Sequence, residues 1–160
     1  MIQQNINRSD VFNRSWAEYK VGFNESTGNY WLGNDLLSQL TMTDRYKLRI
    51  DLQSRSTNNW YYAEYSTFIV QPESDNYRLR LSGYSGNVAW DGFSNHDGTM
   101  FSTFDRDNDQ FKPYNCATYN GGGFWYHACC NCCVNKYNPA WVYLIGGNAL
   151  QSTRMWLQCK

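Results

Sequence analysis

The chain has 160 residues and equal numbers of basic and acidic side chains, 14 of each, so its formal net charge at pH 7 is zero. This balance excludes the basic surface of a protein that binds nucleic acid or an anionic membrane. The sequence contains no apolar run of 18 residues, which excludes a membrane-spanning helix. The length favours one domain that can bury most of its apolar surface.

Aromatic and cysteine residues dominate the composition. Thirteen Tyr and seven Trp supply rings with large contact areas and a polar handle, which suits binding surfaces as well as cores. Six cysteines favour an oxidising compartment, and Asn-x-Ser sequons at Asn7, Asn13 and Asn24 are compatible with secretion. The first ten residues, MIQQNINRSD, lack the apolar segment of a signal peptide.

Two short helices are predicted near the start of the chain. The first has an aromatic face formed by Phe12, Trp16 and Tyr19. Ser9 or Asp10 can cap its start, and Gly22 can end it. The second has an apolar face formed by Leu36, Leu37 and Leu40, and the Asn34 side chain is expected to cap it.

Strands are predicted where apolar and polar residues alternate with a period of two. The alternating segments are 46–52, 61–70, 77–82 and 155–159. The first three are joined by short connections without helices, so we expect them to pair antiparallel. The last one can return to the same sheet.

Regular periodicity fades after Gly83 for about sixty residues. Such a long irregular segment belongs in a compact domain when it is functional or is held by metal ions and disulfides. The part from Phe101 to Cys133 contains an acidic run, an aromatic segment behind three glycines, and five of the six cysteines. We therefore expect the functional residues to lie here.

The acidic run consists of Asp105, Asp107 and Asp109. Carboxylates at every second position of a polar loop can turn several oxygens onto a hard cation such as Ca²⁺. A solvated surface loop explains the same spacing, because the glycine and distal Glu of an EF-hand are missing. Spacing alone leaves both interpretations open.

The cysteines and histidines permit further chemistry. Cys129 with Cys132 and Cys130 with Cys133 form two overlapping C-x-x-C pairs, which are compatible with zinc or redox chemistry. Zinc is disfavoured because a second, distant C-x-x-C or a pair of spaced histidines is missing. The two histidines stand in no pattern with a nucleophile and an orienting acid, so we expect no enzyme activity.

Several ordered motifs carry a resemblance to a known family. They are FNRSWAEYKVGF at 12–23, YWLGND at 30–35, GYSG at 83–86, FST at 101–103, DRDND at 105–109, NCA at 115–117 and GFWYHAC at 123–129. Together they resemble the fibrinogen C-terminal domain. The resemblance implies an α+β fold with a twisted antiparallel sheet, short helices and a long loop-rich C-terminal region that holds Ca²⁺ and ligand sites. It also implies that residues 1–160 form one such domain without its N-terminal part, because members carry a further stretch before the position of Met1.

The resemblance assigns the Ca²⁺ ligands. The side chains of Asp107 and Asp109 are expected to bind the ion, aided by the main-chain carbonyls of Phe111 and of Pro113 or Tyr114. The Ca²⁺ site then outweighs the solvated loop.

The resemblance also implies a disulfide between Cys116 and Cys129. The other four cysteines lack family counterparts: Cys130, Cys132, Cys133 and Cys159. They are expected to form an additional bridge, stay reduced or pair between chains.

The family recognises acetylated sugars or amines in a pocket beside the Ca²⁺ loop. Its floor is the peptide between Ala128 and Cys129, which the family holds in the cis form, so that the N–H groups of Cys129 and Cys130 face the ligand. This chain departs from the pattern, with Cys130 in place of His and Asn120, beside Tyr119, in place of Tyr. The neutral Asn120 also disfavours a pocket for a cationic peptide amine.

Other features of the pocket wall depart from the family as well. The loop between Tyr137 and Trp141 is shorter than in the family. A purely structural role remains open for four aromatic residues: Tyr119, Phe124, Trp125 and Tyr126. We therefore expect any acetyl-group binding to be weaker than in well-matched relatives.

Two functions from different classes remain. The first is a secreted, Ca²⁺-dependent module of lectin type that binds glycans or other acetylated ligands, as the resemblance to ficolin-like proteins implies. The alternative is a structural or adhesive domain that binds extracellular protein receptors, like those of tenascins and angiopoietins. Either module is expected to be oligomerised through regions outside this chain.

Overall fold

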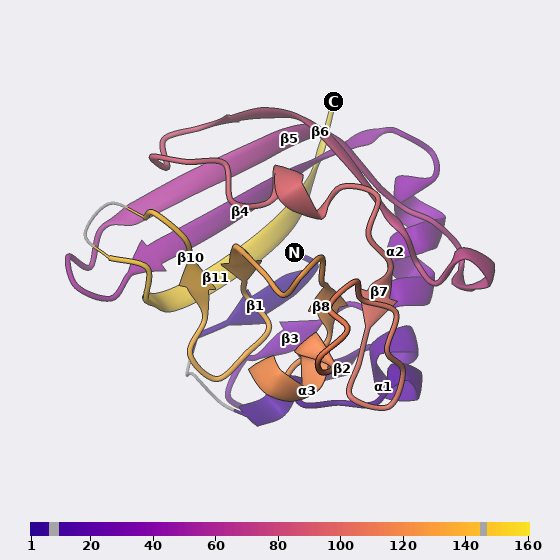
Figure 1. Cartoon of the computed structure of the whole chain (residues 1–160). Coiled ribbons are helices and arrows are strands. Elements are labelled where there is room, and N and C mark those ends of the chain that lie inside the picture. Colours follow the sequence, from indigo (N-terminus) through magenta and orange to yellow (C-terminus); the bar gives the residue numbers. More distant parts are fainter. Residues whose placement is uncertain (7–9, 145–146) are drawn as a thin grey trace.

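The computed structural model describes residues 1–6, 10–144 and 147–160. Within these ranges the largest element is a seven-stranded antiparallel sheet with the order β2-β3-β1-β11-β4-β5-β6 (Figure 1). Its strands are β1 (Gln3–Asn5), β2 (Phe23–Asn24), β3 (Tyr30–Trp31), β4 (Tyr46–Ser54), β5 (Trp60–Val70), β6 (Leu79–Gly86) and β11 (Leu150–Cys159). The α+β class and the antiparallel pairing predicted from the sequence are confirmed.

The alternating pattern places one face of the central strands in the core. In β4, Leu48, Ile50 and Leu52 are fully buried, while the residues between them are partly exposed. Several strand bounds differ from the prediction. β4 ends at Ser54, β5 begins at Trp60 and β6 ends at Gly86, so each of these strands extends beyond its predicted bound. β11 begins at Leu150, before the alternation starts. β6 begins at Leu79 because Tyr77 has a φ of 50°, which is incompatible with an extended strand, and its hydroxyl donates to Asp35 Oδ1 at 2.5 Å.

The two predicted helices exist, but their starts differ from the prediction. α1 (Trp16–Val21) begins after Ser15, which forms a capping box with Glu18, so Asp10 does not cap it. Phe12 instead ends a 3₁₀ turn, η1 (Asp10–Phe12), and the other proposed cap, Ser9, lies outside the described residues, as does the sequon residue Asn7.

The predicted end of α1 is confirmed. Gly22 has a φ of 92°, and a Cβ there would lie 2.5 Å from the Leu32 carbonyl oxygen, so only glycine fits. α2 (Asn34–Thr41) starts without a capping side chain, because Asn34 Oδ1 accepts a hydrogen bond from Trp31 Nε1 instead.

The irregular half of the molecule lies over one face of the sheet (Figure 1). It lies between β6 and β11 in the chain, and its described part contains only short elements: η3 (Ser94–His96), β7 (Phe101–Ser102), α3 (Cys116–Asn120), β8 (Phe124–Trp125), β9 (Cys132–Cys133) and β10 (Ala140–Trp141). A further 3₁₀ turn, η2 (Glu73–Asp75), links β5 to β6. Trp125 joins the irregular half to the sheet. Its ring centroid lies 6.0 Å from that of Phe68 in β5 of the sheet and 5.1 Å from that of Phe101 in β7 of the irregular half. No helix in the described ranges is long and apolar enough to cross a membrane.

Candidate functional site

Asp105 has a structural role. Its Oδ1 accepts hydrogen bonds from the Trp16 backbone N–H at 2.9 Å and from the Thr103 hydroxyl at 2.7 Å. Asp105 therefore joins the acidic loop to the first turn of α1.

Asp107 and Asp109 form a separate carboxylate pair. Asp109 accepts the N–H groups of Phe111 and Cys116, each at 2.7 Å, and Asp107 accepts the N–H of Asp109 at 3.2 Å. Burial raises the pKa of Asp109, and the neighbouring Asp107 carboxylate adds to this shift. Among the described residues neither carboxylate has a salt-bridge partner. A pair of adjacent carboxylates without a basic partner, followed by main-chain carbonyl groups, is an oxygen-only donor set that fits Ca²⁺.

Three rings lie in a row beside this loop, and we call Phe111, Tyr114 and Tyr119 the aromatic row. The Phe111 and Tyr114 ring centroids are 4.6 Å apart, and those of Tyr114 and Tyr119 are 4.9 Å apart. The exposed fraction is 44% for Tyr114 and 71% for Tyr119. Tyr119 is therefore a surface residue, whereas Phe124, Trp125 and Tyr126 are core residues, as the structural interpretation of those three predicts.

Two disulfides hold the segment after the acidic loop. Cys116 pairs with Cys129, as the resemblance implies, with their Cα atoms 5.2 Å apart. Cys130 pairs with Cys133, with their Cα atoms 5.8 Å apart. Of the two overlapping C-x-x-C pairs, only Cys130 with Cys133 forms a disulfide, and Cys129 is bonded to Cys116 instead, so the four cysteines of these pairs do not form a zinc site. Cys132 is a buried free thiol and Cys159 is an exposed one.

The expected cis peptide before Cys129 is wrong. None of the peptide bonds in the described part of the protein is cis. The backbone reverses here through a positive φ of 46° at Cys129, and the His127 N–H donates to the Cys129 carbonyl at 3.1 Å. The turn is thus closed by a local hydrogen bond, and the acetyl-pocket floor expected between Ala128 and Cys129 is not formed in that way.

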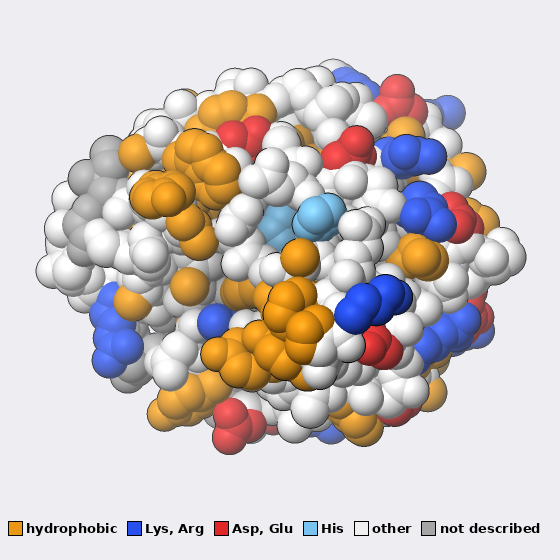
Figure 2. Space-filling view, viewed as in Figure 1, with side chains coloured by type: hydrophobic (Ala, Val, Ile, Leu, Met, Phe, Trp, Pro, Cys, Tyr) orange, Lys and Arg blue, Asp and Glu red, His pale blue; other side chains and the backbone are white. Residues whose placement is uncertain are grey.

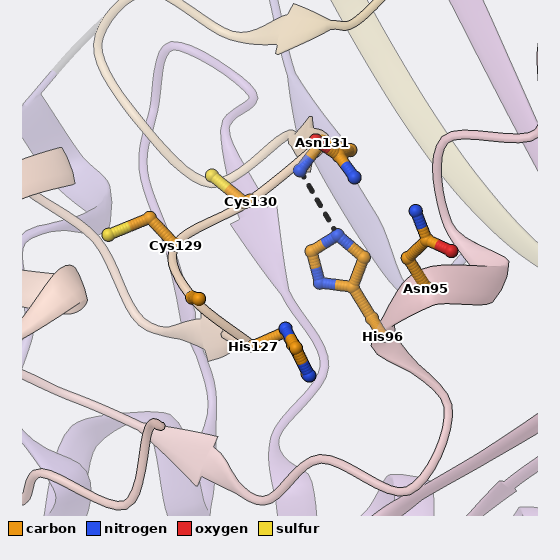
Figure 3. A pocket seen from close by; sticks show the side chains of 7 residues that line it. Asn95, His96, His127, Cys129, Cys130 and Asn131 are labelled. Atoms are coloured by element: carbon orange, nitrogen blue, oxygen red, sulfur yellow. Dashed lines mark hydrogen bonds between the residues drawn. The ribbon is translucent and has the colours of Figure 1, made fainter. Parts of the chain in front are cut away.

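A pocket of about 250 Å³ lies on this turn (Figure 3). It is lined by Asn95, His96, His127, Ala128, Cys129, Cys130 and Asn131. Of the predicted ligand-binding residues, Ala128, Cys129 and Cys130 are brought together here. Tyr119 and Asn120 do not line it.

His96 forms the back of the pocket and is held from two sides. Its Nδ1 lies 2.6 Å from the Trp125 carbonyl oxygen, and its Nε2 accepts the Asn131 N–H at 3.2 Å (Figure 3). A carbonyl only accepts, so the proton is on Nδ1. Burial lowers the pKa of His96 to about 4, so the ring is neutral at physiological pH. The exposed His127 lies at the mouth.

Sequence reasoning missed four pocket residues: Asn95, His96, His127 and Asn131. His96 and Asn131 are 35 positions apart, and no periodic pattern connects them. Their proximity results from how η3 and the segment after β8 fold over the sheet.

The pocket lies on a face with exposed aromatic side chains. Figure 2 shows the histidines near the centre of this face, with apolar side chains gathered on either side. Besides the aromatic row, Tyr143 is 67% exposed and packs edge-on against Trp90 with ring centroids 5.5 Å apart. We call Trp90 and Tyr143 the aromatic pair.

Comparison with known proteins decides the family. The family model of the C-terminal globular domain of fibrinogen beta and gamma chains matches residues 1–159. The chain belongs to this family. It is 38% identical to mouse microfibril-associated glycoprotein 4 over all of its own length and 62% of that protein. It is 47% identical to mouse angiopoietin-related protein 1 over 80% of its own length and 26% of that protein. The chain therefore spans less than two thirds of these relatives.

Solved structures agree with this assignment. The fibrinogen-like globe domain of human ANGPTL6 superposes with a TM-score of 0.90 at 35% identity, covering 99% of this chain and 77% of that one. A lamprey fibrin D-dimer complexed with the peptide Gly-His-Arg-Pro-amide superposes with a TM-score of 0.86 at 33% identity, covering 98% of this chain and 59% of that one.

Proposed function

We propose that the chain is an extracellular module that binds a protein partner through the face around the His96 pocket. The observation that carries this proposal is the pair of exposed aromatic clusters beside the pocket, the aromatic row and the aromatic pair. Exposed apolar patches of this kind mark interaction sites. Tyr and Trp are also the residues that most often dominate the binding energy of protein interfaces.

The pocket chemistry favours a protein over an acetylated glycan. The peptide between Ala128 and Cys129 is trans, and the Cys130 side chain is tied up in a disulfide. The N–H groups of Cys129 and Cys130, which would donate to an acetyl oxygen in the family's pocket, are therefore arranged differently here. Mouse microfibril-associated glycoprotein 4 and mouse angiopoietin-related protein 1 are named for an association with microfibrils and a relationship to angiopoietin, which agrees with a role in extracellular assemblies.

Ca²⁺ has a supporting role in this proposal. Asp107 and Asp109 would hold the ion with carbonyl groups from Phe111 and from Pro113 or Tyr114. A bound cation supplies charge that offsets the two adjacent carboxylates. Two residues of the aromatic row, Phe111 and Tyr114, lie between Asp109 and Cys116, so a Ca²⁺ ion that holds this loop in place would also hold these two rings in place. The two disulfides support secretion.

A lectin-type module is the second candidate, because a pocket of about 250 Å³ with polar walls has room for an acetyl group. Titration of the oligomerised protein with N-acetylglucosamine tests it. Saturable binding that His127→Ala weakens would favour the lectin.

The protein-binding proposal is tested by screening the oligomerised protein against purified extracellular ectodomains and a glycan array in parallel, since avidity reveals weak single sites. Tyr119→Ala and Tyr143→Ala should each weaken ectodomain binding by about tenfold or more. Trp60→Ala is the matched control, because Trp60 is 43% exposed but lies on the sheet. Binding to glycans alone, or equal losses with Trp60→Ala, would overturn the proposal.

A further inference from the structure

The disulfide between Cys130 and Cys133 closes a very short loop at the edge of the pocket. The sequence separation is only 3, whereas Cys116 and Cys129 are separated by 13. Cys130 lines the pocket and is partly exposed, and Cys133 in β9 is 6% exposed. Cys130 is thus the accessible sulfur, and Cys133 is the protected one.

Polar groups around this bridge suit its reduced form. Asn120 Oδ1 lies 3.9 Å from Cys130 Sγ and 3.8 Å from Cys133 Sγ, and the same oxygen accepts a hydrogen bond from Lys136 Nζ at 3.3 Å. The Cys130 carbonyl oxygen lies 3.8 Å from Cys133 Sγ. Thiols formed at these positions would find hydrogen-bond acceptors without rearrangement. The Lys136 ammonium group is linked to both sulfurs through Asn120, and a cation in this position favours a cysteine thiolate, which is the leaving group.

The surrounding cysteines do not compete with this chemistry. Cys116 is fully buried, so a reductant reaches that bridge only through Cys129. Cys132 is fully buried as well, and burial raises the pKa of its thiol, which keeps it protonated and unreactive. Opening this short loop frees less conformational entropy than opening the loop between Cys116 and Cys129, so the fold should survive reduction of the Cys130–Cys133 bridge.

We propose that the Cys130–Cys133 bridge is a thiol–disulfide exchange site whose co-substrate is a dithiol reductant. One thiolate of the reductant attacks Cys130 Sγ, the bond between the two cysteine sulfurs breaks, and Cys133 leaves as a thiolate. The second thiolate of the reductant then attacks its own sulfur in the mixed disulfide. The reductant leaves as a disulfide, and Cys130 and Cys133 take up two protons from water. Two electrons pass from the dithiol to the cysteine pair.

Reduction would change the pocket wall. The short loop contains Asn131, whose N–H donates to His96 Nε2 at the back of the pocket (Figure 3). With the bridge open, this contact loses its covalent support. The exchange reaction stands on its own, whereas control of partner binding by this reaction rests on the proposed function.

The order of reduction tests the exchange site. The folded protein is incubated with increasing dithiothreitol, trapped with N-ethylmaleimide and analysed by peptide mass spectrometry. Cys130 and Cys133 should be labelled at dithiothreitol concentrations about tenfold lower than Cys116 and Cys129, while the near-UV circular dichroism stays native. Labelling of all four cysteines together, or labelling of Cys130 and Cys133 only when the protein unfolds, overturns the proposal.

Variants of Lys136 test whether its positive charge speeds reduction of the Cys130–Cys133 bridge, as distinct from an effect of its side chain on local packing. Lys136→Met should slow reduction of the bridge about threefold, because the departing thiolate loses its cationic neighbour, and Lys136→Arg should restore the rate. Cys132→Ala is the control and should leave the order of reduction unchanged. Equal rates for Lys136→Met and Lys136→Arg would contradict the assigned role of the ammonium group.

Hydrogen–deuterium exchange tests the effect on the pocket without a partner. The double variant Cys130→Ser with Cys133→Ser mimics the reduced pair, and its peptides across 129–134 should exchange several-fold faster than in the oxidised protein, with the sheet unchanged. Unchanged exchange in 129–134 overturns the effect on the pocket. Failure of every ectodomain to bind would overturn the proposed function but leave the dithiothreitol result intact, so the two failures are distinguishable.

Discussion

The sheet and the irregular half of this molecule are specified by different information. In β4, β5 and β11 the residue pattern repeats every two positions, and each strand makes a ladder with its neighbour. The irregular half instead depends on single contacts, such as the Trp125 indole donating to the Tyr77 carbonyl at 2.7 Å. The hydrophobic core is therefore continuous, although a repeating residue pattern forms one side of it and single specific contacts form the other.

Trp125 gives the largest expected effect, because it joins the two regions. Trp125→Ala should lower the free energy of unfolding by about 4 to 5 kcal/mol, since it empties a fully buried site and leaves the Tyr77 carbonyl without its donor. Urea denaturation measures this loss, and Ile50→Val in the sheet, at about 1 kcal/mol, is a mild reference. A loss below that of Ile50→Val would mean that the irregular half is not part of the cooperative core.

His96 gives the irregular half a pH dependence of its own. Its pKa is about 4 in the folded state and about 6.5 when unfolded. Above pH 6.5 the ring is therefore neutral in both states, and His96 costs the folded state no stability. As the pH falls from 6.5 to 4, only the unfolded state takes up the proton, and about 3 kcal/mol of stability is lost.

Denaturation at several pH values checks this prediction. His96→Gln should remove that part of the pH dependence, whereas the exposed His127→Gln should keep it. Parallel pH profiles for the original protein and His96→Gln would contradict the assigned neutral state of His96.

The two disulfides should differ in their contribution to the irregular half. Replacing both Cys116 and Cys129 by Ala should cost about 3 kcal/mol in the chain-entropy model, because the bridge closes the longer loop. Replacing both Cys130 and Cys133 by Ala should cost about 2 kcal/mol. Thermal unfolding of both double variants measures the difference, and a larger loss from the shorter bridge would reverse the expected order.

Ca²⁺ gives the smallest expected effect. At about 2 mM Ca²⁺ and a Kd on the order of 10⁻⁴ to 10⁻³ M, binding to the folded state should add about 0.6 to 1.8 kcal/mol. Thermal melts with Ca²⁺ and with chelator measure this gain. Asp107→Asn should abolish it, whereas Asp105→Asn, in the same loop, should keep it. A gain that survives Asp107→Asn would contradict the assigned ligand.

More of the sheet than of the candidate site could be predicted from the sequence. Four strands of the sheet, β4, β5, β6 and β11, were predictable because burial of one face imposes a period that is visible in the residues themselves. β1, β2 and β3 were not, because they have 3, 2 and 2 residues, too few to show a period. The cap of α1 was missed although Ser15 and Glu18 have the S-x-x-E spacing of a capping box, because the aromatic spacing from Phe12 placed the start of the helix one turn too early. Family motifs supplied the Cys116–Cys129 pairing. Neither source predicted the trans peptide before Cys129 or the contact between His96 and Asn131, because both depend on how loops pack.

The position of β11 has a consequence for biosynthesis. It lies between β1 and β4, so the first strand of the sheet has no central neighbour until the last one has been made. A ribosome adds about 5 to 20 residues per second, so β11 is made roughly 7 to 30 seconds after β1, whereas β4, β5 and β6 can already form a meander in that interval. During that interval the growing polypeptide exposes the open edges of β1 and β4. Nascent molecules of this family member should therefore depend on chaperones until the final ten-residue strand emerges and closes the gap.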